Sequence, residues 1–245
     1  MLRLARRSPR RGLQPPHIGH MVCAQEALVA LGLDEVVLIP VGEAPHREVE
    51  ADPGGEVRLA LCEAAAAADD RLVTSRLELD RPGPSYTADT LAELARERPG
   101  DELVLILGAD EAGSLPSWHD PQRVLASATV AAVEREGLRR EEIRERVAGL
   151  AGAERMEFFA MPRIDVSSTL VRRRVREGLS IRYLVPDAVA ELVSTRGLYR
   201  SSNVGDGAER SGATDVSSVS GVADSGRRRS ARQAPGTIAT GAGAS

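Results

Sequence analysis

Short, almost continuous runs of β-branched and aliphatic residues recur along the chain. Runs of this kind are typical of parallel strands that are buried on both faces. They predict five strands, at residues 35–39, 72–79, 103–107, 129–133 and 156–161.

Segments of helical length lie between these runs. The first ends at Gly32, which is a good C-terminal cap, and Pro99 and Gly100 follow the third. We predict helices at residues 17–31, 57–68, 87–98, 168–177 and 186–193. The alternation of strands and helices predicts the α/β fold class, with a Rossmann-like doubly wound parallel sheet and helices on both faces.

The C-terminal stretch differs from the rest of the chain. Residues 200–245 are mostly Ser, Gly, Ala, Thr and Arg, and such a segment cannot bury enough apolar surface to offset its ordering entropy. We therefore expect a single catalytic domain over residues 1–199, large enough for one core, and a disordered low-complexity tail over residues 200–245.

Charge and cysteine content narrow the class of protein. The formal net charge of -4 gives no global attraction to nucleic acid or acidic membranes, so we expect neither as a partner. No apolar run reaches the ~20 residues that span a bilayer, and the basic start lacks a following apolar segment typical of export signals. Cys23 and Cys62 have no metal-ligand spacing and suit reduced core residues. These features favour a cytoplasmic protein without a metal held by its own side chains.

Residues 15–20, with the sequence Pro-Pro-His-Ile-Gly-His, open the first predicted helix. His17 and His20 lie three residues apart, so both imidazoles can point at one phosphate from neighbouring positions of one face. Gly19 leaves room for a nucleotide, and the free amide groups of a helix start favour an anion. A histidine pair of this kind is also compatible with ordinary core or surface positions.

A second phosphate-binding helix start is predicted near the end of the domain. Ser167, Ser168 and Thr169 begin a helix, and Arg172 lies one turn beyond Ser168. Hydroxyl groups at this position are usually simple helix caps. Here the guanidinium and the helix-end amides could converge on the same polyphosphate, which favours nucleotide chemistry.

Together, the His-x-Gly-His pair and the Ser-Ser-Thr-x-x-Arg string resemble the signature of nucleotidyltransferases with a Rossmann-like fold. Further segments resemble bacterial nicotinate-nucleotide adenylyltransferases. The similarity extends over about residues 15–193, and these segments are 39–47, 83–91, 107–110 with 115–118, and 180–186.

The resemblance implies how ATP is bound. His17, His20 and Arg172 would hold the ATP phosphates, and Mg²⁺ would bridge phosphate oxygens with few or no protein ligands. Further contacts to ATP are implied for Gly19, Gly108, Asp110, Ser167, Ser168 and Thr169. A Gly-x-Asp turn after a strand is also common as plain turn chemistry, so the assignment of Gly108 and Asp110 depends on the resemblance.

The resemblance also implies an acceptor site for nicotinate mononucleotide. Trp118, the only tryptophan of the chain, would stack on the nicotinate ring, although a loop tryptophan is equally compatible with a core position. Tyr86 and Thr87 stand at a predicted helix start that would receive the pyridine carboxylate, where capping is the alternative. Pro45, His46 and Arg47 would lie near the mononucleotide, with Arg47 where the family more often has Lys.

The N-terminal segment departs from the family pattern. The family's first strand runs into close-approach glycines, a Phe and an Asn or Asp, whereas residues 10–14 are Arg-Arg-Gly-Leu-Gln. Residues 1–11 do not have the pattern of a buried central strand. Rereading residues 5–15 one nucleotide downstream can recover glycines and Phe-Asn-Pro, so we hypothesise a frameshift near Pro15 or Pro16, which sequencing of the gene would test.

The sequence thus predicts an enzyme that transfers the adenylyl group of ATP to nicotinate mononucleotide in NAD biosynthesis. Two alternatives stay open: a nucleotide-binding homologue impaired by its altered glycine loop, and a sister enzyme with another acceptor, such as nicotinamide mononucleotide or phosphopantetheine. A class I aminoacyl-tRNA synthetase is disfavoured because the chain lacks a Lys-Met-Ser-Lys-Ser motif. The sequence does not determine the oligomeric state.

Overall fold

The computed structural model describes residues 3–5, 13–43, 52–134 and 140–200. The strands are β1 (Arg3–Ala5), β2 (Val36–Leu38), β3 (Leu72–Thr74), β4 (Val104–Gly108), β5 (Thr129–Glu134) and β6 (Glu157–Ala160). The helices are α1 (Ile18–Ala30), α2 (Gly55–Ala66), α3 (Leu77–Asp80), α4 (Thr87–Glu97), α5 (Ala109–Gly113), α6 (Pro121–Ser127), α7 (Arg140–Val147), α8 (Ser168–Arg176) and α9 (Asp187–Thr195). Two 3₁₀ turns, η1 (Leu115–Ser117) and η2 (Ala153–Arg155), complete the described elements.

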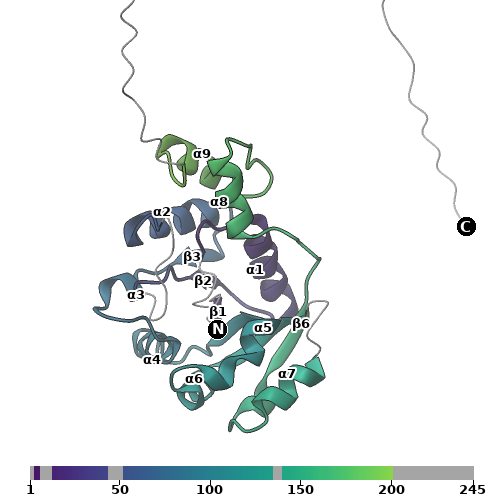
Figure 1. The fold of residues 1–245 in the computed structure, drawn as a ribbon. Coiled ribbons are helices and arrows are strands. Elements are labelled where there is room, and N and C mark those ends of the chain that lie inside the picture. The colour runs from purple at the N-terminus through teal and green to yellow at the C-terminus, as the bar shows by residue number, and fades with distance from the viewer. Residues whose placement is uncertain (1–2, 6–12, 44–51, 135–139, 201–245) are drawn as a thin grey trace, which may run out of the picture. The chain divides into compact units, whose positions relative to one another are not determined.

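The strands form one parallel sheet in the order β3-β2-β1-β4-β5-β6. Helices α1 and α2 lie on one side of this sheet, and α4, α6 and α7 lie on the other (Figure 1). The predicted doubly wound α/β fold is confirmed. In this order the chain changes direction across the sheet between β1 and β4, and ligands of such folds bind outside the carboxyl ends of the strands at that point.

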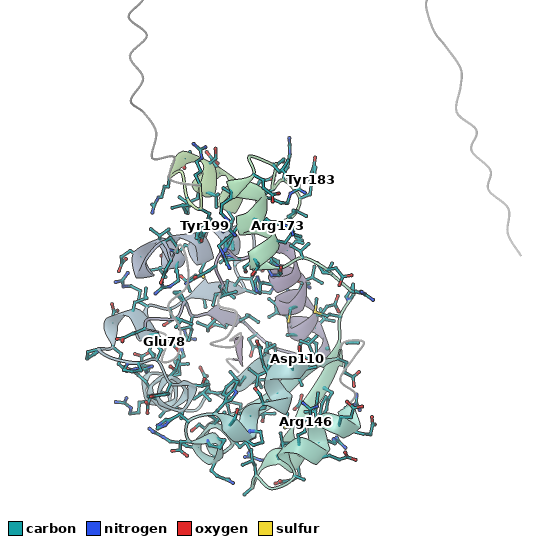
Figure 2. All side chains as sticks on the ribbon, in the orientation of Figure 1. Glu78, Asp110, Arg146, Arg173, Tyr183 and Tyr199 are labelled. Carbon is teal, nitrogen blue, oxygen red and sulfur yellow. The ribbon has the colours of Figure 1, made fainter. Side chains whose placement is uncertain are left out.

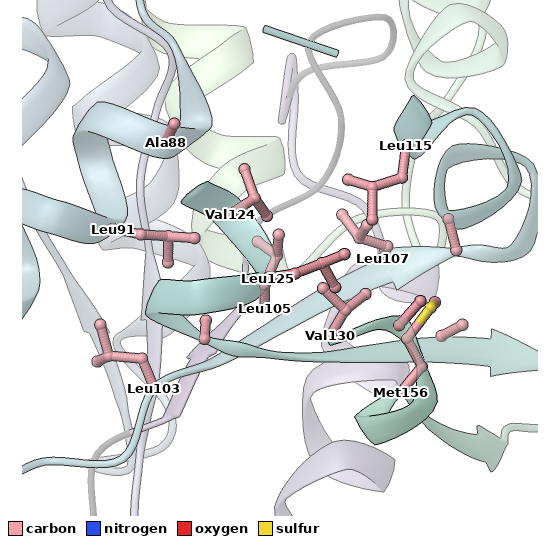
Figure 3. Packing of buried hydrophobic residues seen from close by; sticks show 14 of the residues in the cluster. Ala88, Leu91, Leu103, Leu105, Leu107, Leu115, Val124, Leu125, Val130 and Met156 are labelled. Atoms are coloured by element: carbon pink, nitrogen blue, oxygen red, sulfur yellow. The ribbon is translucent and has the colours of Figure 1, made fainter. Parts of the chain in front are cut away.

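Alternating side chains of the strands build a separate core on each face. In β4, Leu105 and Leu107 pack with the residues of α4, α6 and α7, whereas Val104 and Ile106 pack with those of α1 and α2. The first of these clusters contains Leu91, Leu105, Leu115 and Leu125 (Figure 3). The period of two residues along β4 is the reason that one strand can supply both cores.

A third apolar cluster joins the C-terminal helices to α2. Leu61 and Ala65 of α2 pack against Val171 of α8 and against Val189 and Val193 of α9. This contact fixes α8 beside the domain, which matters because the predicted Ser-Ser-Thr-x-x-Arg string begins this helix.

The structure corrects two expectations about strands. Residues 3–5 pair in parallel with both β2 and β4, so the N-terminal segment does supply the central strand that its sequence pattern did not indicate. Strand pairing uses main-chain groups, and the position between two strands outweighs a weak local preference. The strand expected at residues 72–79 ends at Thr74, and α3 follows. The prediction was too long because periodicity alone does not distinguish a strand from a helical turn in so short an apolar run.

The structure also bears on what the sequence predicted for the cysteines, for membrane-spanning helices and for the C-terminal tail. Cys62 is buried, Cys23 is partly exposed, and neither forms a disulfide bond. Within the described ranges, no helix is long and apolar enough to cross a membrane. The predicted tail, apart from Arg200, lies outside the described residues.

Candidate active site

His17 and His20 stand at the start of α1, on the edge of the sheet where strands end. His17 is the N-cap residue with extended backbone angles, and the two imidazole rings lie with their centroids 3.7 Å apart. Both side chains are buried, with 2% and 6% of their surface exposed. The predicted pair on one helix start is therefore present as a single compact group.

The hydrogen bonding of His20 defines which ring nitrogen can donate to a ligand. The main-chain N–H of His17 donates to Nδ1 of His20 at 3.0 Å. A ring nitrogen that accepts a hydrogen bond carries no proton, so in the neutral imidazole the proton is on Nε2. His20 is thus oriented as an Nε2–H donor, the form that suits a phosphate oxygen without requiring an imidazolium.

Gly19 makes room for the His17 ring. A Cβ atom at Gly19 would lie 3.1 Å from both Cε1 and Nδ1 of His17, and 3.4 Å from Ile164 Cγ2. Such an atom would crowd the His17 ring, so Gly19 leaves space for the close, tilted arrangement of the two imidazoles. Its predicted contact with ATP stays a prediction.

Helix α8 is docked on the residues that precede α1. Ser168 Oγ donates to the carbonyl oxygen of Pro15 at 3.0 Å, and Arg172 Nη1 donates to that of Gln14 at 2.6 Å. In addition, the N–H of Ile18 donates to the carbonyl oxygen of Leu184, just before α9, at 2.9 Å. Two segments more than 150 residues apart in sequence are thereby joined.

The three hydroxyl groups at the start of α8 have different partners. Ser167 Oγ accepts from the N–H of Leu170 at 3.2 Å, which makes Ser167 the N-cap residue. Thr169 Oγ1 accepts from Arg172 Nη2 at 3.3 Å, and Ser168 binds Pro15 as described. These hydroxyl groups thus make capping and docking bonds, and their contact with ATP stays a prediction. Arg172 is held at the helix start by its bonds to Thr169 Oγ1 and to the carbonyl oxygen of Gln14.

Gly108 ends β4, and Asp110 follows two residues later. β4 is the neighbour of β1 at the point where the chain changes direction across the sheet. Gly108 is the last residue of β4 and the N-cap of α5, and its N–H donates to Glu111 Oε2 at 3.2 Å. Asp110 is exposed at the start of α5 (Figure 2). The carboxyl ends of β1 and β4 are the expected ligand edge of this sheet, so both residues lie where an adenosine could bind.

Aromatic residues from two segments meet at the start of α4. The rings of Tyr86, the N-cap of α4, and His119 are stacked with centroids 4.1 Å apart. The neighbouring Trp118 is partly buried against the core, and its Nε1 donates to Ser114 Oγ at 3.1 Å. The structure thus brings Tyr86 beside the Trp118 loop, and Thr87 is buried in the first turn of α4. Trp118 packs at the edge of the core and keeps a partly exposed ring, and its stacking on the nicotinate ring stays a prediction.

The segment with Pro45, His46 and Arg47 lies outside the described residues, but both of its flanks are held by one side chain. Arg58 of α2, only 5% exposed, donates to the carbonyl oxygens of Val41 and Gly42 and, at 2.5 Å, to Asp52 Oδ1. A guanidinium can do this because its donors are arranged in a fixed fork.

Sequence reasoning missed Arg58, Glu78 and His119. Glu78 is fully buried and accepts a hydrogen bond from Thr90 Oγ1 at 2.7 Å. A charged residue inside an otherwise apolar run, as at Leu77-Glu78-Leu79, was the available signal for Glu78. Arg58 stands within an alanine-rich helix pattern, where a lone arginine is indistinguishable from a surface residue.

Comparison with known proteins agrees with this geometry. Residues 13–174 match the family model described as cytidylyltransferase-like. The protein named "Probable nicotinate-nucleotide adenylyltransferase" of Rubrobacter xylanophilus is 38% identical over 188 residues, which are 76% of this chain and 88% of that protein. A protein of the same name from Thermus thermophilus is 42% identical over 186 residues, 76% of this chain and 94% of its own.

A solved structure extends the comparison to the fold. The Plasmodium falciparum nicotinic acid mononucleotide adenylyltransferase complexed with NaAD aligns with a TM-score of 0.65, covering 81% of this chain and 98% of that one. Its sequence identity is 12%, so this likeness concerns the fold alone. The curated relatives and the family model carry the assignment, and by them the chain belongs to the nicotinate-nucleotide adenylyltransferases, a nucleotidyltransferase family with a cytidylyltransferase-like domain.

Proposed function

We propose that this chain transfers the adenylyl group of ATP to nicotinate mononucleotide and releases pyrophosphate, which makes nicotinate adenine dinucleotide, a precursor of NAD. The observation that carries the proposal is the docking of α8 on the start of α1 through Ser168 and Arg172. It places two helix starts, a histidine pair and a guanidinium at one edge of the sheet. Such a concentration of donors suits a polyphosphate.

The reaction requires little beyond positioning and charge neutralisation. A phosphate oxygen of the acceptor attacks the α-phosphorus of ATP, and the bond from that phosphorus to the oxygen of the leaving pyrophosphate breaks. We assign to His17, His20 and Arg172 the binding of the phosphates on which negative charge develops. Preorganised donors can stabilise that charge without a covalent intermediate. Gly108 and Asp110 are assigned to the adenosine, and the main-chain amides at Ser168 and Thr169 to the phosphates.

Mg²⁺ is proposed to enter as part of the substrate MgATP. Among the described residues no group of three His, Cys, Asp or Glu side chains is arranged to hold a metal ion. The main-chain N–H groups and the guanidinium at the starts of α1 and α8 are hydrogen-bond donors that match phosphate oxygens. They cannot ligate Mg²⁺, which prefers oxygen ligands. The side chains present therefore fit a metal that is carried by the phosphates, where it would neutralise their charge.

The acceptor is assigned to the neighbouring loops. We place the nicotinate ring on Trp118 and its carboxylate at the start of α4, beside Tyr86 and Thr87, where amide groups and the helix dipole favour an anion. Pro45, His46 and Arg47 are assigned to the mononucleotide on the strength of the family pattern. The cytoplasm remains the predicted location.

The assay follows pyrophosphate release from MgATP with nicotinate or nicotinamide mononucleotide. We expect turnover with the acid form, and a loss of about 100-fold or more in kcat/KM for Arg172→Ala, because a charged donor to the reacting phosphates is removed. Arg173→Ala is the matched control, since Arg173 is the next residue and is exposed on α8 (Figure 2). Arg172→Ala must also be checked for folding, because it loses the bond to Gln14.

A second form of the protein has its first strand restored from the alternative reading frame. It distinguishes an active enzyme from a nucleotide-binding homologue that is impaired by its altered glycine loop. Product formed only by the restored form would support an impaired chain as written, as would ATP binding without product. Equal activity of both forms would make the arginine-rich start unimportant. Absence of product with either acceptor from both folded forms would remove the adenylyltransferase proposal.

A further inference from the structure

Glu78 is a buried acid that the reaction described above does not use. It lies on α3, a helix of four residues (Figure 2). None of its surface is exposed. Burial of a carboxyl group is costly, and an apolar residue of similar size often gives an equally stable protein or a more stable one. Its contacts therefore need an explanation other than core filling.

The carboxyl group of Glu78 is tied to the first turn of α4. Thr90 Oγ1 lies 2.7 Å from Glu78 Oε1 and 3.1 Å from the carbonyl oxygen of Tyr86. A hydroxyl group has one proton, and the shorter contact to a carboxyl oxygen is the stronger one. Thr90 Oγ1 in turn accepts from Arg81 Nη2 at 2.9 Å. The hydroxyl of Thr90 is thus fixed by two bonds, one that it donates to Glu78 and one that it accepts from Arg81.

The same glutamate lies under the loop that follows β2. A Cβ atom at Gly42 would lie 2.0 Å from the main-chain oxygen of Glu78, so the two backbones are in direct contact. That loop also pairs with the segment before α4, because the N–H of Ser85 donates to the carbonyl oxygen of Glu43 at 2.8 Å. Glu78 therefore stands where α3, the loop after β2 and the start of α4 meet.

We propose that Glu78 is a positioning residue for the acceptor, acting through the Thr90 hydroxyl on the first turn of α4. Thr90 is one turn beyond Tyr86 and Thr87, so fixing its side chain fixes the helix start on which the pyridine ring and its carboxylate are proposed to bind. The inference rests on the proposed function. In this proposal Glu78 contacts neither substrate.

The test compares Thr90→Val, which keeps the shape and removes the hydroxyl, with Thr90→Ser, which keeps the hydroxyl. We expect Thr90→Val to raise the KM for nicotinate mononucleotide about tenfold, since a hydrogen bond to a carboxyl group is lost, and to leave the KM for ATP within about twofold. Thr90→Ser should restore the wild-type value. Glu78→Gln should also stay close to the wild type, because its amide oxygen can still accept from Thr90.

Thr195→Val serves as the control, because it removes another threonine hydroxyl bond, the one to the carbonyl oxygen of Glu191 at 2.9 Å, at an exposed position of α9. Should Thr90→Val fail to fold, Arg81→Gln removes the other partner of the same hydroxyl and is judged by the same criterion.

Three results would overturn the inference. An unchanged KM for nicotinate mononucleotide in Thr90→Val would do so, as would equal changes in both KM values, which indicate a general loss of structure. A tenfold rise in Glu78→Gln would show that charge rather than position matters. Wild-type protein without adenylyl transfer would instead overturn the proposed function, so the two failures are distinguishable.

Discussion

Ser168→Ala removes the hydroxyl group that joins α8 to the segment before α1. The lost bond is the 3.0 Å contact from Ser168 Oγ to the carbonyl oxygen of Pro15, a residue that is itself buried. Pro15 precedes His17 by two positions, so the bond bears on both stability and the placement of the histidine pair.

The magnitude follows from the environment of the carbonyl oxygen. A neutral hydrogen bond contributes about 1 kcal/mol net, and a buried carbonyl left without a partner costs about 1–3 kcal/mol. The Ser168 side chain is only partly buried, so water can approach the vacated position, and we expect a loss of about 1–2 kcal/mol in the free energy of unfolding. In a domain of this size that corresponds to a decrease of about 2–8 °C in Tm.

Urea unfolding gives the stability, and steady-state kinetics give the effect on ATP. We expect kcat/KM for ATP to fall about tenfold, because a small displacement of positioning groups has a large effect on rate. Thr195→Ala is the control, since its hydroxyl also donates to a main-chain carbonyl but on an exposed helix, and it should change stability by less than about 0.5 kcal/mol. If Ser168→Ala behaves like this control in both measurements, the hydroxyl does not hold the two segments together.

Three further substitutions test the surroundings of the site. Gly42→Ala should lower the free energy of unfolding by about 1–3 kcal/mol or more, because its Cβ would lie 2.0 Å from the main-chain oxygen of Glu78, whereas Gly149→Ala, with nothing within 4 Å of the added atom, should be nearly neutral in the same urea titration. Arg58→Lys should cost about 1–3 kcal/mol in that titration, since an ammonium cannot make all the contacts of the guanidinium fork, and an unchanged midpoint would refute that role. Burial raises the pKa of Cys62 from 9.0 to about 12, so the unfolded thiol loses its proton near pH 9 while the folded one keeps it, and stability falls as the pH rises above 9. Between pH 8 and 10 the wild type should therefore lose about 1 kcal/mol more than Cys62→Ala, and equal losses would contradict this.

The sheet and the starts of α1 and α8 could be predicted because their signals are local and strongly patterned. The apolar run at β4 alternates between two cores, and the start of α8 begins with Ser167, which is indeed a helix cap. That the starts of α1 and α8 lie close together was inferred only because both motifs are predicted to bind phosphate. The contacts that join them, to the carbonyl oxygens of Gln14 and Pro15, involve main-chain atoms and leave no trace in the residue types.

Other parts could not be predicted because they depend on distant partners. Residues 77–80 form a short helix although Leu77 and Leu79 have the spacing of a strand, and Leu77 is buried by the core that α4 helps to form. The buried position of Glu78 depends on Thr90, twelve residues away, and the role of Arg58 depends on a loop sixteen residues before it. Single-sequence periodicity contains no information on such pairings.

The docking contacts also bear on the unusual N-terminal segment. Ser168 and Arg172 bind main-chain carbonyl oxygens, and Ile18 is bound by the carbonyl oxygen of Leu184. The start of α1 is therefore positioned in part from the C-terminal side of the domain, and Leu13 also packs in the core that contains Ala24, Ala27 and Leu28 of α1. The bonds to the carbonyl oxygens of Gln14 and Pro15 use main-chain acceptors, so they do not depend on the side chains at these two residues. We therefore expect the form with the restored strand to keep the placement of His17 and His20 while changing the residues that the family pattern puts near the triphosphate.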